Sequence, residues 1–96
     1  MSDWTWEYNP DAEHVVGDLP ELYRQDVEDL ARRIAEAVGV RRIGHPFDIQ
    51  ESASGVKTHA EGPVMIWYQE DYRDDVVLIL RVQHYLAFAA DPNGED

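Results

Sequence analysis

The residues whose types suggest chemistry gather where the last apolar segment of the chain ends. Residues 76–80 are all apolar, and polar residues then bring Arg81, His84 and Tyr85 together at one end of the predicted strand. A histidine titrates near neutral pH, so His84 is a candidate general acid or base. The alternative is an ordinary surface histidine at the end of a strand.

A second group of basic residues lies in the middle of the chain. Lys57 and His59 are two positions apart, so they share one face if residues 56–60 form a strand, and there they would jointly contact a phosphate. Ordinary exposed polar residues are the alternative. Arg41 and Arg42 form a basic edge beside the same face, or they simply complement the C-terminal end of a long helix.

No pattern in the sequence indicates a metal, nucleotide or thiol site. The chain has no cysteine, and the spacing of its four histidines matches no metal-binding motif. It also lacks a P-loop, a dinucleotide fingerprint and the Gly-x-Ser-x-Gly motif of hydrolases. We therefore expect neither a metal nor a cofactor.

Length and charge narrow the class of protein further. A chain of 96 residues with 44% hydrophobic residues predicts one small folded domain, over residues 1–90, followed by a disordered acidic tail, residues 91–96. The net charge of −12 argues against non-specific binding to nucleic acids or anionic membranes, although residues 37–62 hold three acids and three bases. No segment resembles a membrane span or a signal peptide, so we expect a cytoplasmic protein.

The N-terminal part predicts a strand and two helices. Trp4, Trp6 and Tyr8 alternate with polar residues, as in a strand with an aromatic inner face. Residues 11–17 predict a short helix that ends at Gly17.

The long helix is the clearest prediction. It is expected to begin at Asp18 as N-cap and to end near Gly39. On its outer face Asp29 is placed to pair with Arg33. Its apolar stripe consists of Leu22, Tyr23, Val27, Leu30, Ile34 and Val38.

The C-terminal half predicts strands. Residues 47–51 and 56–60 are short candidates, and residues 64–68 and 76–85 form an antiparallel hairpin around a charged turn. The complete prediction is an α+β domain, with an N-terminal strand, a helical hairpin and a three- to four-stranded antiparallel sheet.

This order of elements resembles the RelE/ParE superfamily of bacterial toxins. The resemblance spans residues 4–85 and rests on the order of elements, on residues 62–69 and on residues 76–85. It implies a RelE-like fold. In the RelE and YoeB branches it also implies metal-independent cleavage of mRNA on the ribosome, in which a 2′-hydroxyl attacks the adjacent phosphate. ParE-like branches act on DNA gyrase, and many members bind a cognate antitoxin.

The resemblance carries over to individual residues. His84 and Tyr85 look like the terminal His-Tyr pair of the YoeB branch, and Lys57 lies where RelE-type members place a basic residue. The phosphate-contacting arginine of the family is replaced by Val64, and Arg81 is a candidate substitute. Loss of such a charged contact typically lowers the rate by ~10²–10³.

The expected function is therefore that of a toxin-superfamily protein, an mRNA endoribonuclease with weakened or lost activity. Its catalytic candidates are His84, Tyr85, Arg81 and Lys57, and its RNA-binding candidates are Arg41, Arg42 and His59. The expected partners are a cognate antitoxin or another protein, mRNA on the ribosome, or a second copy in a homodimer. Two alternatives on the same fold are a non-catalytic protein–protein interaction module and an accessory protein that binds a small ligand.

Overall fold

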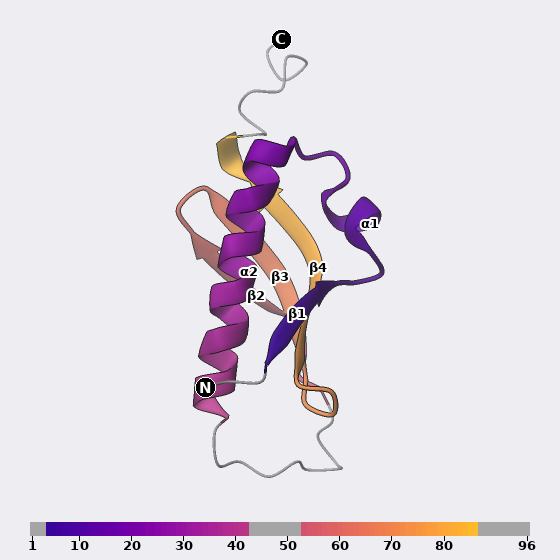
Figure 1. Cartoon of the computed structure of the whole chain (residues 1–96), viewed down its shortest axis with the longest axis vertical. Coiled ribbons are helices and arrows are strands. Elements are labelled where there is room, and N and C mark those ends of the chain that lie inside the picture. Colours follow the sequence, from indigo (N-terminus) through magenta and orange to yellow (C-terminus); the bar gives the residue numbers. More distant parts are fainter. Residues whose placement is uncertain (1–3, 43–52, 87–96) are drawn as a thin grey trace.

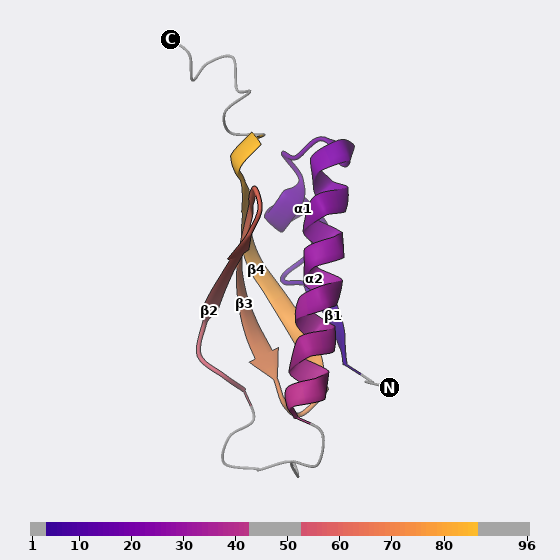
Figure 2. The same ribbon diagram turned by 90° about the vertical axis from the view of Figure 1, so that its left-hand side faces the viewer.

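The computed structural model describes residues 4–42 and 53–86, which form an α+β arrangement of one sheet and one long helix. The long helix α2 lies across one face of the four-stranded sheet (Figures 1 and 2). The predicted strand at residues 47–51 and the predicted tail at residues 91–96 lie outside the described residues. The elements are β1 (Thr5–Tyr8), α1 (Ala12–Val16), α2 (Glu21–Arg41), β2 (Lys57–Glu61), β3 (Val64–Asp71) and β4 (Val76–His84).

The sheet is mixed, with the strand order β1-β4-β3-β2. The strands β2, β3 and β4 are antiparallel neighbours, as predicted, but β1 pairs with β4 in parallel. Parallel neighbours need a crossover connection, and here the chain between β1 and β4 includes α2, which crosses the sheet face. The predicted antiparallel strands are thus present as three neighbours, and the parallel pairing of β1, whose direction the sequence analysis did not predict, makes the sheet mixed.

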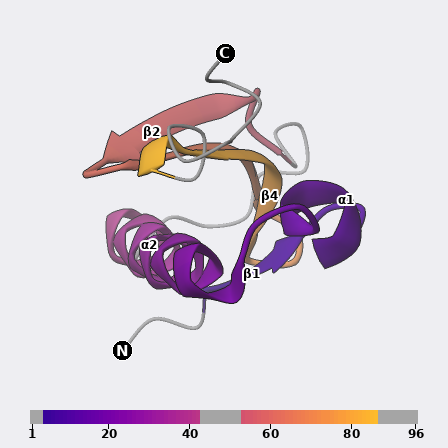
Figure 3. The same ribbon diagram turned by 90° about the horizontal axis from the view of Figure 1, so that it is seen from above.

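The two helices differ greatly in size and position. The helix α1 has five residues, begins at Ala12 and packs against β4. Asp11 is its N-cap, and the Asp11 carboxylate accepts the backbone N–H of His14 at 2.9 Å. Figure 3 shows α1 and α2 beside different parts of the sheet. The expected helical hairpin is thus represented by one long helix and a single short turn of helix.

The long helix differs from the prediction at both ends. It begins at Glu21, with Pro20 as an N-cap that makes no side-chain hydrogen bond, so Asp18 does not cap it. It continues through the buried Gly39 to Arg41. The side chain of Leu22, expected in the apolar stripe, lies in the first turn of α2 and is 72% exposed.

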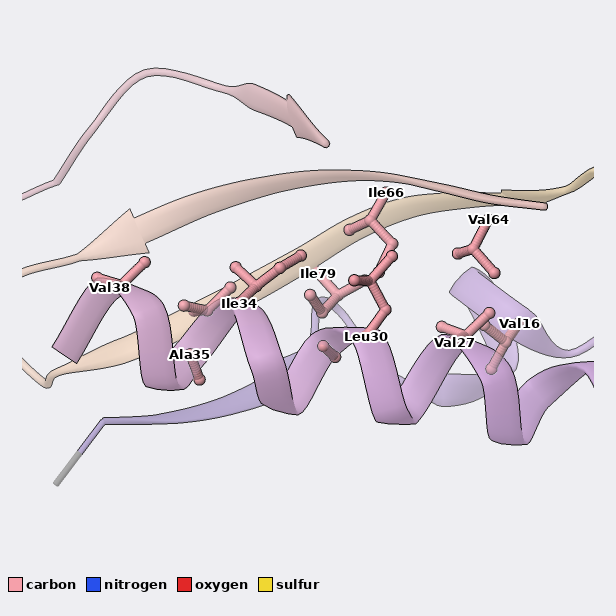
Figure 4. Close-up of a cluster of buried hydrophobic side chains, with 11 residues drawn as sticks. Val16, Val27, Leu30, Ile34, Ala35, Val38, Val64, Ile66 and Ile79 are labelled. Carbon is pink, nitrogen blue, oxygen red and sulfur yellow. The ribbon is translucent and has the colours of Figure 1, made fainter. Parts of the chain in front are cut away.

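The hydrophobic core lies between α2 and the sheet (Figure 4). The stripe of α2 provides most of one side, because residues three and four apart share a helix face. Trp4, Trp6 and Tyr8 are half-buried and pack against it, as their alternation predicts. The buried residues of this core are Val16, Val27, Leu30, Ala31, Ile34, Ala35, Val38, Val64, Ile66, Val77 and Ile79.

Candidate functional site

The imidazole of His84 is enclosed between β4 and the first turns of α2. Its Nε2 atom lies 2.9 Å from Oδ2 of Asp26, and its ring centroid lies 4.5 Å from that of Tyr23. The side chain is 0% exposed. A general acid must reach the proton that it transfers, so the structure does not present His84 to a substrate.

Val64 lies directly opposite His84 in the register of β3 and β4. It is 4% exposed and belongs to the core beneath α2. Position 64, where the resemblance would place a phosphate-contacting arginine, therefore faces the helix. Apolar packing occupies the place where the resemblance predicts a charged site.

The other two candidates at the end of β4 lie elsewhere. Arg81 is opposite Trp67 in the register, and its guanidinium lies 4.9 Å from the centroid of that indole. Tyr85 is exposed and lines a shallow hollow of about 270 Å³ with Met65 and Gln83. Met65, Trp67, Arg81 and Gln83 lie on the strand positions that alternate with the core residues, so they occupy the other face of the sheet. Within the described residues, no helix or strand covers that face (Figure 2).

Lys57 lies at the opposite end of the hairpin from His84. In the register, Lys57 pairs with Tyr68, whereas Glu61 pairs with Val64, the neighbour of His84. The four predicted catalytic residues are therefore divided between the core, the uncovered sheet face and β2. The structure does not bring them together around one point.

A different set of residues forms a groove between α2 and β2. A hollow of about 390 Å³ lies between the two elements, and a second of about 230 Å³ continues it toward the start of α2. Both are lined by Leu30, Arg33 and Glu61, so we treat them as one α2–β2 groove. Its other lining residues are Asp26, Asp29, Ile34, Ala37, Val38, Arg41, His59, Gly62, Pro63, Val64 and Tyr68.

The two ends of the α2–β2 groove carry opposite charge. Asp26 and Asp29 lie at the end near the start of α2, and Arg33 and Arg41 lie toward its other end. Between them the floor is apolar, formed mainly by the stripe of α2. The predicted RNA-binding residue His59 lines the basic part of the groove.

Glu61 joins α2 to β2 across the groove. The guanidinium of Arg33 donates to Oε2 of Glu61 at 3.1 Å, and Nε2 of His59 lies 3.4 Å from its Oε1. These side chains are about half exposed, so their mutual attraction is screened by water. They are accessible to a ligand that competes for them. Lys57 shares their face of β2 because it is two positions from His59.

Arg41 is fixed at the basic end by a buried carboxylate. Its Nη2 donates to Oε2 of Glu70 at 2.5 Å, and the hydroxyl of Tyr72 donates to the other oxygen at 2.9 Å. Glu70 is 1% exposed, while about half of the Arg41 side chain remains exposed. The hydrogen bond to Glu70 raises the pKa of Arg41. Arg41 thus presents a guanidinium of fixed position to the groove, and Glu70 offsets part of its charge.

The remaining predicted RNA-binding residue, Arg42, does not line the groove. Its guanidinium lies 4.1 Å from the ring centroid of Tyr72. Tyr68, in contrast, lines the groove floor. Burial, and secondarily the charge of Glu70, raises the pKa of Tyr68, so its hydroxyl remains protonated at neutral pH.

Sequence reasoning missed the roles of Arg33, Glu61 and Glu70. Arg33 was expected to pair with Asp29 on a solvated helix face, but its partner is Glu61, 28 positions away. The hydrogen bond from Arg32 to Asp29 occupies that carboxylate at 3.2 Å. The sequence indicated only that Arg33 lies beside the apolar stripe of the helix. That position does not predict a partner on a distant strand such as Glu61.

Comparisons with protein-family models, with curated proteins and with solved structures find no match to this chain. The resemblance to the toxin superfamily therefore rests on the residues and the element order alone. Among residues 4–42 and 53–86, no helix is long and apolar enough to cross a membrane. In the same part of the chain, no three histidine or acidic side chains converge as metal ligands would.

Proposed function

We propose that this chain is a RelE/ParE-like protein that acts as a protein-binding module, and that its α2–β2 groove receives an extended segment of a partner protein. The observation that carries this proposal is the groove itself, with an apolar floor and opposite charges at its two ends. The succession of one strand, two helices and three strands is the order on which the toxin resemblance rests. An antitoxin-like protein is the class of partner that this resemblance implies.

The positions of the predicted catalytic residues favour this alternative over RNA cleavage. His84 is enclosed by Asp26 and Tyr23, and Arg81 lies on the other face of the sheet. Proton transfer and phosphate stabilisation must act at one place. A non-catalytic module requires no such convergence.

The dimensions of the groove suit a short extended segment. From Asp26 to Arg41, α2 rises by about 22 Å. An extended chain covers this length with roughly seven residues. The best occupant has a basic side chain beside Asp26 and Asp29, apolar side chains over Leu30, and an acidic side chain beside Arg41. The groove is open and elongated, which suits an extended peptide. A small ligand usually binds in a more enclosed pocket that buries most of its surface.

Peptide binding tests the proposal. The probes are two labelled synthetic peptides, one with a basic end, an apolar middle and an acidic end, and one with the reverse order. Because Ala37 lines the groove at an exposed position, Ala37→Trp should block it without disturbing the core. Gln25→Trp is the matched control, since Gln25 is exposed on α2 and does not line the groove.

We expect fluorescence anisotropy to show that one of the two peptides binds the wild type and Gln25→Trp alike, and Ala37→Trp at least about tenfold more weakly. Failure of both peptides to bind the wild type, or equal binding to all three proteins, would contradict the proposal. Inducible expression gives a second readout. Growth arrest by the wild type that is relieved by Arg81→Ala, a substitution at an exposed catalytic candidate, would favour the ribonuclease instead.

A further inference from the structure

The strand β2 ends the sheet and has one unpaired backbone edge among the described residues. It pairs only with β3 in the strand order β1-β4-β3-β2. Glu61 and Val64 flank a two-residue turn, so Glu61, His59 and Lys57 exchange backbone hydrogen bonds with β3. By the same alternation, Thr58 and Ala60 direct their N–H and C=O groups outward. These groups are a template for another strand.

We propose that a second copy of this chain pairs with β2 in the antiparallel direction, about a two-fold axis that passes through the pair of His59 residues. Lys57 and Glu61 lie two positions before and after His59. Antiparallel pairing centred on His59 therefore places Lys57 of each copy opposite Glu61 of the other. Opposite charges directly across a strand pair stabilise it, and both such pairs form at once.

The backbone register supports the same centre. Around this axis Thr58 of each copy faces Ala60 of the other, and these are the residues whose polar backbone groups point outward. The pairing would form on the order of four interstrand hydrogen bonds. If the register were shifted by one position, Lys57 of one copy and Glu61 of the other would lie on opposite faces of the joined sheet and could not pair.

The local charge also permits two acidic chains to meet at β2. The chain carries −12 overall, but residues 37–62 hold equal numbers of acids and bases. Arg33, which lies outside this segment, adds a positive charge beside β2. Elsewhere, like charges would oppose the approach of a second copy.

The dimer would change the surroundings of the α2–β2 groove. A two-fold axis perpendicular to the sheet keeps both α2 helices on the same face. The two grooves then open toward each other, and the β2 strand of the second copy adds Lys57 and Glu61 to the open side of each. This inference goes beyond the binding of a partner segment and does not depend on it.

Charge exchange at the two ends of β2 tests the dimer on the full chain. Sedimentation velocity from low micromolar to near-millimolar concentration should show the wild type passing from monomer to dimer. Lys57→Glu or Glu61→Lys places like charges opposite each other twice, so each variant alone should self-associate about tenfold more weakly or worse. An equimolar mixture of the two variants, and the double variant Lys57→Glu/Glu61→Lys, should both recover the association.

Two controls separate this surface from a general effect of net charge. Glu7→Lys changes the net charge as Glu61→Lys does, but on the exposed face of β1. Arg73→Glu changes the net charge by the same amount as Lys57→Glu, but in an exposed turn away from β2. Both should associate like the wild type, and circular dichroism checks that all variants are folded. A wild type that remains monomeric throughout would overturn the inference. So would association of the single variants equal to that of the wild type, or a mixture that does not recover it.

Discussion

His84 and Arg81 lie three residues apart on β4, yet their side chains occupy opposite faces of the sheet. His84 faces α2 and contacts Asp26, whereas Arg81 lies against Trp67 on the uncovered face. A substrate on one face cannot contact both. The two side chains therefore cannot act together on one phosphate, and the burial of His84 beside Asp26 and Tyr23 indicates a structural role.

Replacement of His84 should therefore lower stability. His84→Ala removes the contact with Asp26 and leaves a cavity beside Tyr23, so we expect a loss of about 2–4 kcal/mol in the free energy of unfolding. Urea denaturation followed by circular dichroism measures it. Tyr85→Ala is the comparison, because Tyr85 is exposed and should change stability by less than about 1 kcal/mol. Equal effects of the two substitutions would contradict the buried position of His84.

Glu70 and Glu61, the carboxylates that pair with Arg41 and Arg33, should differ in their contribution to stability. Glu70→Gln removes the charge that faces Arg41 from a buried position, and we expect a loss of about 1–3 kcal/mol. Glu61→Gln is the matched change in an exposed pair and should cost less than about 1 kcal/mol. Thermal unfolding of both variants beside the wild type provides the measurement. A larger loss for Glu61→Gln would show that the buried pair is misassigned.

Stability should decrease at alkaline pH because of Tyr8 and Tyr68. Burial, with the nearby charge of Glu28 in one case and of Glu70 in the other, raises the pKa of both hydroxyls above the ordinary value of 10.0. Below about pH 10 both states of the protein keep these protons, so this contribution to stability is fully present. Above about pH 10 the tyrosine hydroxyls lose their protons in the unfolded chain but keep them in the folded protein. The free energy of unfolding therefore decreases with rising pH until the pH exceeds the raised pKa values of the folded state.

Urea midpoints across the alkaline range would measure this loss, and tyrosinate absorbance would follow the ionisation. Tyr8→Phe should show a smaller loss between neutral and alkaline pH than the wild type. Tyr85→Phe is the control at an exposed site and should follow the wild type. An unchanged pH dependence in Tyr8→Phe would exclude Tyr8 as a source.

The two leucines of α2 give a test of which face of the helix is buried. Leu30 is fully buried in the core, whereas Leu22 is exposed in the first turn. We expect Leu30→Ala to cost about 2–5 kcal/mol and Leu22→Ala less than about 0.5 kcal/mol. Chemical denaturation of the two variants compares them directly. Similar losses would place Leu22 in the core, as its sequence spacing suggests.

Local patterns predicted much of the fold. The spacing of Val27, Leu30, Ile34 and Val38 is a property of one helix, and it correctly identified the buried face of α2. Charged turn residues between two apolar runs likewise identified the antiparallel pair β3 and β4. The direction of β1 required knowledge of where the chain returns after α2, which no local pattern contains.

The candidate site depended more on contacts between distant residues. Asp26 is 58 positions from His84, and Glu70 is 29 positions from Arg41, so neither partner follows from spacing. One signal was present in the sequence. Arg81 and His84 are an odd number of positions apart on a strand, and side-chain alternation alone predicts that they diverge.

The described chain begins and ends at opposite ends of the α2–β2 groove. The ring centroid of Trp4 lies 6.3 Å from that of Tyr72, whose hydroxyl donates to Glu70 at the Arg41 end. At the Asp26 end, the backbone N–H of Tyr85 donates to the carbonyl oxygen of Pro63. Because the sequence has no cysteine, Thr5→Cys or Leu86→Cys would each provide one unique attachment point for a dye at an exposed position. Energy transfer to a dye on one end of a bound peptide would then reveal the direction in which the peptide runs along the groove.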